Sequence, residues 1–232
     1  MRLDKFLCEM NIGTRSEVKA FLKQGHVTVN NSKVTRPEVQ INEENDLICF
    51  KGTPLKYSVF EYYMLNKPQG CVTATEDKRD KTVMEYLPAG HRSDVFPVGR
   101  LDKDTEGLLL LTNDGDLAHR LLSPKKHVDK TYLVDLDHSL TLEETKQLEE
   151  GVDIGEKALT RPAKVMMLND TQMHLTIQEG KFHQVKRMLQ AVGNKVVHLK
   201  RITFGALTLD PTLAPGDCRS LTDKEIKSLY EP

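Results

Sequence analysis

The first fifty residues alternate between helical and strand-like patterns. Four apolar residues recur at helical spacing before the stop signal Asn11-Ile12-Gly13: Leu3, Phe6, Leu7 and Met10. Thr14 or Ser16 begins a second amphipathic helix, which Gly25 ends. Short strands are expected at 27–29, near 33–35 and at 46–50. Residues 51–56 contain Gly and Pro, which interrupt helix and strand alike and predict a linker.

The rest of the chain predicts many strands and few helices. The segments whose apolar or alternating patterns fit strands are 62–65, 95–98, 108–111, 131–136 and 195–200. A short helix fits 116–121 with Asp116 as its cap, and another starts near His183 and turns Val185 and Met188 inward. We therefore expect two domains, residues 1–58 and residues 59–232.

Composition describes a folded protein without a membrane span. Of 232 residues, 38% are hydrophobic and 29% are charged, which excludes a disordered chain. No stretch approaches the ~20 apolar residues of a transmembrane helix, and acidic residues interrupt the N-terminus where a signal peptide needs an apolar run. The four cysteines are isolated and lack metal-binding spacing. We expect reduced thiols in a cytoplasmic protein.

Charge is separated into blocks, although the net charge is only −1. Residues 1–36 carry seven basic and three acidic residues, and residues 181–201 carry six basic and no acidic ones. Residues 135–156, by contrast, carry eight acidic residues and one basic residue. The basic blocks are either ordinary solvated faces or surfaces on which a phosphate backbone lies.

A cationic face is expected on the second helix. Arg15, Lys19 and Lys23 lie four residues apart and line one side of it, and Arg2 and Lys5 on the preceding helix extend it. Spacing alone favours a solvated stripe. About residues 1–50 also resemble the S4 RNA-binding domain, in the opening Arg-Leu-Asp-Lys-Phe-Leu, the Thr-Arg-Ser helix start and Gly-His-Val-Thr-Val-Asn-Asn. The resemblance implies that these five basic residues bind structured RNA.

A polar loop between two apolar strands is the most informative segment. It carries Arg100, Asp102, Asp104, Thr105 and Glu106. Buried strands on both sides would hold the loop rigidly, as the presentation of a reactive carboxylate requires. Asp102 and Asp104 have the spacing of some metal sites, but no further ligand cluster accompanies them, and we expect no metal.

Residues 99–115 resemble, residue for residue, the signature of the pseudouridine synthases related to the ribosomal small-subunit enzyme. Asp102 matches the catalytic aspartate of that family. The segment Lys-Thr-Tyr-Leu-Val matches its second motif, which implies that Tyr132 lies in the active site. In its third motif, matched by residues 179–189, a basic residue reaches the aspartate. Lys186 is the match by position, but many relatives place Arg there and Arg187 is adjacent, so the role stays open between the two. Arg187 is also a candidate to bind substrate.

The family's reaction converts a uridine in RNA to pseudouridine. The uracil is cut from the ribose, turned, and rejoined through C5, so nothing leaves and neither a metal nor an organic cofactor is needed. The sequence leaves open whether Asp102 attacks the sugar, stabilises an oxocarbenium ion or abstracts the C2′ proton. Tyr132 is a candidate to pack on the uracil ring and, through its hydroxyl, to take the C5 proton.

Three further residues have two interpretations each, and a fourth has no assigned chemistry. Arg100 either fills the place in the RNA that the extruded uridine vacates, or braces the loop through a salt bridge. His183 and Gln184 either bind substrate or cap and support the helix. Lys67 lies in an Asn-Lys-Pro turn, and we assign it no chemistry.

The expected substrate is small-subunit (16S) ribosomal RNA, free or in a partly assembled small subunit. The alternatives are a large-subunit (23S) rRNA pseudouridine synthase and a non-catalytic S4-type RNA-binding or ribosome assembly factor. A base-removing glycosidase lacks a clear acid/base partner. The implied fold is α+β, with a small N-terminal S4-like (αL) domain and a catalytic domain built on a long mixed, mostly antiparallel sheet. Composition gives no reason to expect more than a monomer.

Overall fold

The computed structural model describes residues 1–231, which divide into two compact units. The first unit contains Met1–Glu61 and Leu87–Val95. The second contains Tyr62–Tyr86 and the chain from Phe96 onward. The sequence predicted one boundary near residue 58 and did not predict that residues 87–95 return to the first unit. Within the described chain, no helix is long and apolar enough to cross a membrane.

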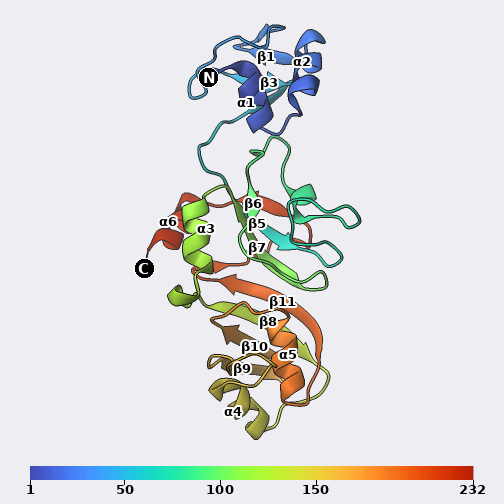
Figure 1. Cartoon of the computed structure of the whole chain (residues 1–232), viewed down its shortest axis with the longest axis vertical. Helices are drawn as coiled ribbons and strands as arrows, with labels where there is room; N and C mark the ends of the chain where they lie inside the picture. Colours follow the sequence, from blue (N-terminus) through green and yellow to red (C-terminus); the bar gives the residue numbers. More distant parts are fainter. Residues whose placement is uncertain (232) are drawn as a thin grey trace. The chain divides into compact units, whose positions relative to one another are not determined.

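The first unit packs two helices against a four-stranded antiparallel sheet (Figure 1). Its elements are α1 (Leu3–Glu9), α2 (Arg15–Lys23), β1 (Val27–Val29), β2 (Ser32–Lys33), β3 (Ile48–Phe50) and β4 (Thr53–Leu55), with strand order β2-β1-β3-β4. The predicted apolar faces of α1 and α2 form its core. Thr14, rather than Ser16, caps α2: its side chain accepts from the amide of Glu17, whose carboxylate accepts from the amide of Thr14.

The prediction of a linker over residues 51–56 is wrong. Residues 53–55 form β4, which pairs with β3 across a turn where Lys51 and Gly52 have φ of 48° and 83°. Pro54 is tolerated because β4 lies at the edge of the sheet, where a missing amide donor leaves no neighbouring strand unpaired.

Arg92 joins the returning segment to the first unit. Its guanidinium is 2.9 Å from a carboxylate oxygen of Asp94 and 3.6 Å from one of Glu9, and it lies 5.1 Å above the ring of Tyr57. Its backbone amide donates to Glu61 at 2.8 Å. These contacts explain why residues 87–95 pack here although they form no helix or strand.

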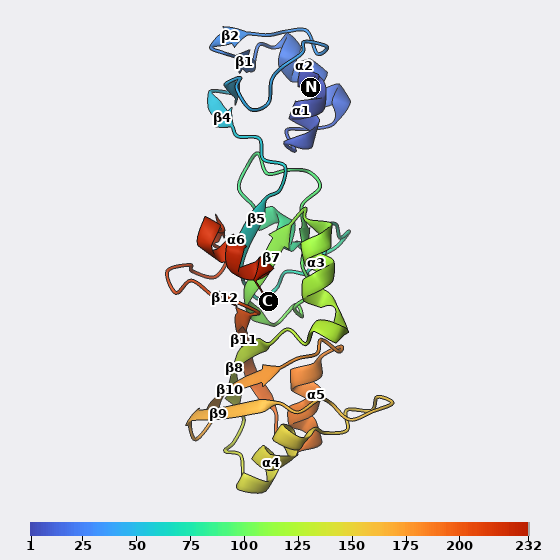
Figure 2. The same cartoon turned by 90° about the vertical axis from the view of Figure 1, so that its left-hand side faces the viewer.

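The second unit is built on a nine-stranded mixed sheet (Figure 2). Its strands are β5 (Tyr62–Lys67), β6 (Phe96–Pro97), β7 (Glu106–Thr112), β8 (Lys130–Leu136), β9 (Lys164–Asn169), β10 (Gln172–Ile177), β11 (Val196–Phe204), β12 (Leu207–Thr208) and β13 (Cys218–Ser220). The order is β13-β5-β7-β11-β8-β10-β9, with β6 on β7 and β12 on β11. All pairs are antiparallel except β7 with β11. The expected mixed, mostly antiparallel sheet is confirmed.

Four α-helices and two short 3-10 helices accompany this sheet. They are η1 (Val83–Tyr86), α3 (Gly115–Leu122), η2 (Pro124–Lys126), α4 (Leu142–Glu150), α5 (Gln184–Ala191) and α6 (Asp223–Tyr230). Asp114, rather than the predicted Asp116, caps α3, because its Oδ1 accepts from the amide of Leu117 at 2.9 Å. Asp116 instead lies in the first helical turn.

Gly107 allows the parallel strands β7 and β11 to approach closely. Its φ is 103°, and a Cβ at this position would overlap the backbone of Arg201. Any other residue would therefore displace β11. Because β11 also pairs with β8, where Arg201 lies opposite Tyr132, this contact joins the loop that precedes β7 to the strand that carries Tyr132.

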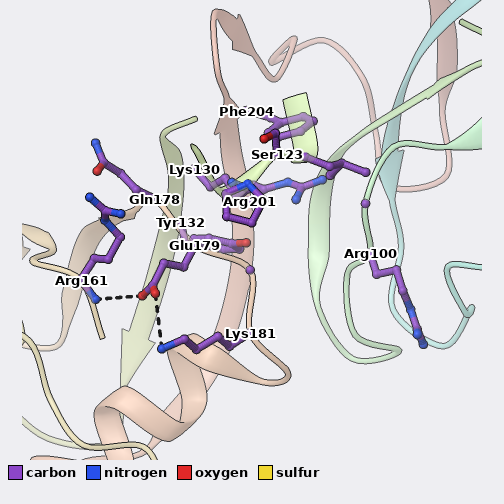
Figure 3. Close-up of a pocket in the computed structure, with 14 residues that line it drawn as sticks. Arg100, Ser123, Lys130, Tyr132, Arg161, Gln178, Glu179, Lys181, Arg201 and Phe204 are labelled. Carbon is purple, nitrogen blue, oxygen red and sulfur yellow. Dashed lines mark hydrogen bonds and ion pairs between the residues drawn. The ribbon is translucent and has the colours of Figure 1, made fainter. Parts of the chain in front are cut away.

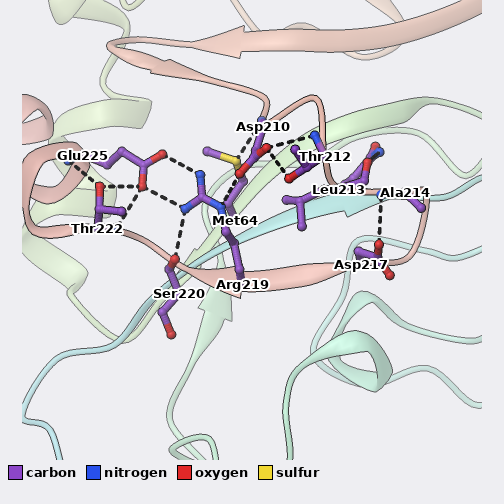
Figure 4. Close-up of polar contacts among 11 residues, drawn as sticks. Met64, Asp210, Thr212, Leu213, Ala214, Asp217, Arg219, Ser220, Thr222 and Glu225 are labelled. Carbon is purple, nitrogen blue, oxygen red and sulfur yellow. Dashed lines mark hydrogen bonds and ion pairs between the residues drawn. The ribbon is translucent and has the colours of Figure 1, made fainter.

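Arg219 on β13 joins the C-terminal segments (Figure 4). Its Nε donates to Asp210 and its Nη2 to Glu225, each at 2.8 Å. The hydrogen bond from Arg219 lowers the pKa of Glu225 to about 2. Hydrogen bonds from the hydroxyl and amide of Thr212, with a further one from Arg219, lower the pKa of Asp210 to about 2.

We expect Arg219→Met to lower the Tm at neutral pH by about 5 °C, because two carboxylates lose a charged donor. Both folded pKa values lie below the ordinary 3.8 and 4.5, so this stabilisation is complete above about pH 4.5 and is lost as the pH falls toward 2. Thermal unfolding followed by circular dichroism from pH 7 to pH 3 should show the wild-type advantage shrinking. A Tm difference that stays constant over this range would contradict the assignment.

Candidate active site

Asp102 lies in the loop that leads into β7, and α5 supplies its partners. Lys186 Nζ donates to Asp102 Oδ2 at 3.1 Å and to Asp104 Oδ1 at 2.6 Å. His183 Nε2 lies 3.6 Å from Asp102 Oδ1. The Asp102 side chain is 26% exposed and the Asp104 side chain 70%, so only Asp102 is largely enclosed. The predicted loop and the third motif therefore meet in space.

Lys186 and the carboxylates beside it stabilise one another's charged forms. Burial lowers the pKa of Lys186, but hydrogen bonds to Asp104 and Asp102 outweigh it, and the pKa is raised overall. The hydrogen bond from Lys186 in turn lowers the pKa of Asp104. Lys186 thus remains a cation at neutral pH and supplies positive charge to both carboxylates.

Helix geometry decides between Lys186 and Arg187. Adjacent helical residues point in directions about 100° apart, so only one of the two can face the loop. Arg187 turns to Glu156, which it contacts at 3.0 Å, and to the backbone carbonyls of Phe182 and Ile154. It lines neither cavity described below. Lys186 is the residue that reaches Asp102.

Two neighbouring cavities share Tyr132. The smaller, of about 60 Å³, is lined by Asp102, Lys186, His183 and Leu199 among others. The larger, of about 510 Å³, lies beyond Tyr132 (Figure 3). Tyr132 is 8% exposed and sits on β8, as its alternation in the sequence suggested. The enclosed carboxylate and the tyrosine predicted beside it thus line one pocket.

Arg100 lies at the rim of both cavities. It is exposed, and Figure 3 shows its side chain pointing away from the other labelled residues. Among residues 1–231 it forms no salt bridge, so the alternative in which it braces the loop through an ion pair is wrong.

His183 and Gln184 differ in what they support. His183 precedes α5 with φ of 49°, and its side chain makes no capping hydrogen bond; its ring stacks on that of Phe182 at 3.8 Å. Gln184 is 4% exposed, accepts from the amide of Lys181 at 3.0 Å and donates to Glu179 at 3.0 Å. Gln184 therefore fixes the turn before α5, and His183 faces the carboxylate.

Comparison with known proteins places this arrangement in a family. The family model described as RNA pseudouridylate synthase matches residues 61–191, and the S4 domain model matches residues 1–48. The chain belongs to the RNA pseudouridine synthase family.

Relatives of full length support the same assignment. The chain is 50% identical to an uncharacterized RNA pseudouridine synthase of Bacillus subtilis (strain 168), covering 100% of this chain and 99% of the relative. It is 44% identical to ribosomal small subunit pseudouridine synthase A of Yersinia pestis, with 100% and 99% covered. A crystal structure described as pseudouridylate synthase matches with a TM-score of 0.71 and 43% identity over 99% of both chains. The protein is therefore a pseudouridine synthase of the same type as ribosomal small subunit pseudouridine synthase A. Its S4 domain implies RNA binding.

Lys67 of this pseudouridine synthase has a place in the site that the sequence did not reveal. It is fully buried at the end of β5. Its Nζ donates to the carbonyl oxygens of Asp102 and Thr105 at 2.9 Å each and to that of Pro68 at 3.1 Å. Burial lowers its pKa. The sequence did contain one signal for this role, since Lys67 directly continues a buried strand. The prediction of a turn at Asn-Lys-Pro obscured it.

The predicted cationic face of the S4 domain is narrower than expected. Arg2 is bonded to Asp4 at 2.8 and 3.0 Å, and Lys5 lies 3.6 Å from Glu9. Arg15, Lys19 and Lys23 are exposed on α2 and form no salt bridge within the described chain. The synthase thus offers three uncompensated cations on α2 and two that are already paired on or beside α1.

Proposed function

We propose that the protein isomerises one specific uridine of small-subunit (16S) ribosomal RNA to pseudouridine, with Asp102 as the essential group and without a cofactor. The observation that carries the proposal is one largely enclosed carboxylate, held by Lys186 in a pocket that Tyr132 also lines. Relatives named for the small subunit support the choice of RNA, at 44% identity in Yersinia pestis and 42% in Escherichia coli (strain K12). We also propose that it acts as a cytoplasmic monomer.

The geometry supports a separate task for each group at the site. Lys67 fixes the backbone of the loop. Lys186 on α5 and His183, the residue before α5, approach the two carboxylate oxygens of Asp102. Attack on the sugar, stabilisation of an oxocarbenium ion and removal of the C2′ proton all need a carboxylate held in a fixed direction. The Tyr132 ring offers a surface for the uracil once the uridine has left its stacked context.

Pseudouridine mapping tests this function. Both ribosomal RNAs from cells with and without the protein are treated with a carbodiimide that stops reverse transcriptase at each pseudouridine. We expect one stop in the small-subunit RNA to disappear and to return with wild type but not with Asp102→Asn. Loss of a stop in the large-subunit RNA would overturn the substrate, and no lost stop in either would overturn the ribosomal assignment.

The α2 cations should carry most of the S4 contribution to RNA affinity. We expect the triple variant Arg15→Gln/Lys19→Gln/Lys23→Gln to weaken binding and to lower the slope of log affinity against log salt by about 2, since each phosphate contact releases counterions. The control Arg2→Gln/Lys5→Gln removes cations that are already paired and should change the slope less. Filter binding to a small-subunit RNA fragment at several salt concentrations measures both. If the slope of log affinity against log salt is equal in wild type and the triple variant, the basic residues of α2 are solvated and do not contact RNA.

A further inference from the structure

We propose that the 510 Å³ cavity beyond Tyr132 is a second nucleotide subsite, which takes the base next to the target uridine through carbonyl oxygens that accept from Lys130 and Arg201. This inference rests on the proposed RNA-modifying function. It adds a base preference that neither the family motifs nor the Asp102 pocket contains.

The position of the cavity suits a neighbouring nucleotide. It shares Arg100, Tyr132, Gly180 and Lys181 with the pocket around Asp102. An RNA strand that delivers one base to that pocket therefore brings the adjacent base to the opening of this cavity. Its volume lies within the ~300–1,000 Å³ of typical small-molecule sites, whereas the 60 Å³ pocket has no room for a second ring.

Two buried cations lie in this cavity without an acidic partner. Arg201 is 2% exposed and Lys130 9% exposed, and neither forms a salt bridge with any residue from 1 to 231. Arg201 Nε donates to the Leu108 carbonyl at 2.8 Å, but its Nη2 has no hydrogen-bond partner. A buried guanidinium nitrogen without an acceptor is costly, so the unpaired Nη2 indicates that a ligand supplies one.

The surroundings of Lys130 lead to the same conclusion. Its Nζ donates to the Val128 carbonyl at 2.9 Å. Asp129, the one carboxylate whose charge favours protonated Lys130, is itself bonded to Lys164 at 3.1 Å and Gln178 at 2.9 Å. Burial, with a smaller effect of neighbouring Arg201, lowers the pKa of Lys130 to about 8. A bound acceptor would further stabilise the protonated form.

The walls of the cavity favour a base over a phosphate as the occupant. Figure 3 shows Lys130, Tyr132 and Arg201 together in the middle of the view, with Phe204 above them. The Phe204 ring lies 4.9 Å from the Arg201 guanidinium and 5.6 Å from Lys130 Nζ. Leu122, Pro124 and Phe204 form the apolar part of the lining, and Lys181 is already paired with Glu179 at 3.3 Å. The apolar part with the two donors matches a flat ring that carries carbonyl oxygens. Guanine, uracil and cytosine have such oxygens and adenine has none.

Dinucleotides test the subsite directly. Full-length protein is titrated by NMR with UMP and with UpN and NpU, where N is each of the four bases. In either the UpN or the NpU series, we expect dinucleotides in which N is guanine, uracil or cytosine to bind about tenfold more tightly than the one in which N is adenine. The difference corresponds to one charge-assisted hydrogen bond. Equal affinities for UMP and all dinucleotides, or competition by ribose 5-phosphate alone, would overturn the proposal.

Two variants locate the effect. Ser123 lines the cavity, so Ser123→Phe should fill it and remove the advantage of dinucleotides over UMP. The matched control Ser139→Phe, on the exposed turn after β8, should retain that advantage. Lys130→Met should remove the discrimination against adenine. If both cavity variants bind like wild type, the subsite is elsewhere. These titrations do not depend on ribosomal mapping, so the two proposals can fail separately.

Discussion

Asp102→Asn is expected to lower kcat for pseudouridine formation by more than about 10³-fold, with RNA affinity nearly unchanged. Asparagine keeps the shape of the side chain and its capacity to accept a hydrogen bond from Lys186, but it carries no negative charge. Every proposed role of Asp102 needs that charge, whether it bonds to the sugar, stabilises a cation or removes a proton. The RNA contacts that we propose for α2 lie on the S4 domain and are untouched.

Asp104→Asn is the matched control for this prediction. Asp104 lies two residues away on the same loop and also accepts from Lys186, but it is 70% exposed and does not line the pocket. We expect it to retain activity within about tenfold of wild type, since only a partly solvated ion pair is lost. Tritium release from small-subunit RNA labelled at uracil C5 measures both variants. Similar losses in the two would mean that the charge of the loop matters and not the position of Asp102.

Local pattern was sufficient for most elements of this fold. The apolar periodicity of residues 3–10 and 14–23 predicted α1 and α2, because each helix has to bury one face only. The continuous run Leu108–Leu111 predicted a fully buried strand, and β7 lies in the interior of the nine-stranded sheet with neighbours on both edges. The candidate site followed from motif resemblance, and the structure brings Asp102, Tyr132 and Lys186 to one pocket.

The features that the sequence did not reveal depend on tertiary position. Pro54 excludes an interior strand but not an edge strand, and which of the two applies is decided by the order of the sheet. Residues 87–95 carry no periodic pattern, and Arg92 holds them through partners distant in sequence. Whether Lys186 or Arg187 faces Asp102 depends on how α5 is rotated about its axis. His183, the residue before the helix, sets that rotation through its positive φ.

Lys67 is the clearest example of such a feature, because a charged residue is ordinarily expected at the surface. Lys67→Met is expected to lower kcat by more than about tenfold and to destabilise the protein by about 2 kcal/mol or more. The substitution removes the Lys67 donor from the carbonyl oxygens of Asp102, Thr105 and Pro68. The Asp102 carbonyl still accepts from the amide of Thr105 and the Pro68 carbonyl from the thiol of Cys71, so we count the loss as about 1–3 kcal/mol in all. The loop would then relax, and Asp102 would lose its fixed direction.

The measurement has to separate positioning from folding. Activity is compared well below the Tm of Lys67→Met, where circular dichroism shows a fully folded population, and stability is read from urea unfolding. A positioning role lowers kcat per folded molecule and leaves KM for the RNA nearly unchanged, because the RNA contacts proposed for the S4 domain remain. Lys103→Met is the control, since Lys103 belongs to the same loop but pairs with Asp80 at the surface. If folded Lys67→Met turns over like wild type, Lys67 stabilises the loop without directing the carboxylate.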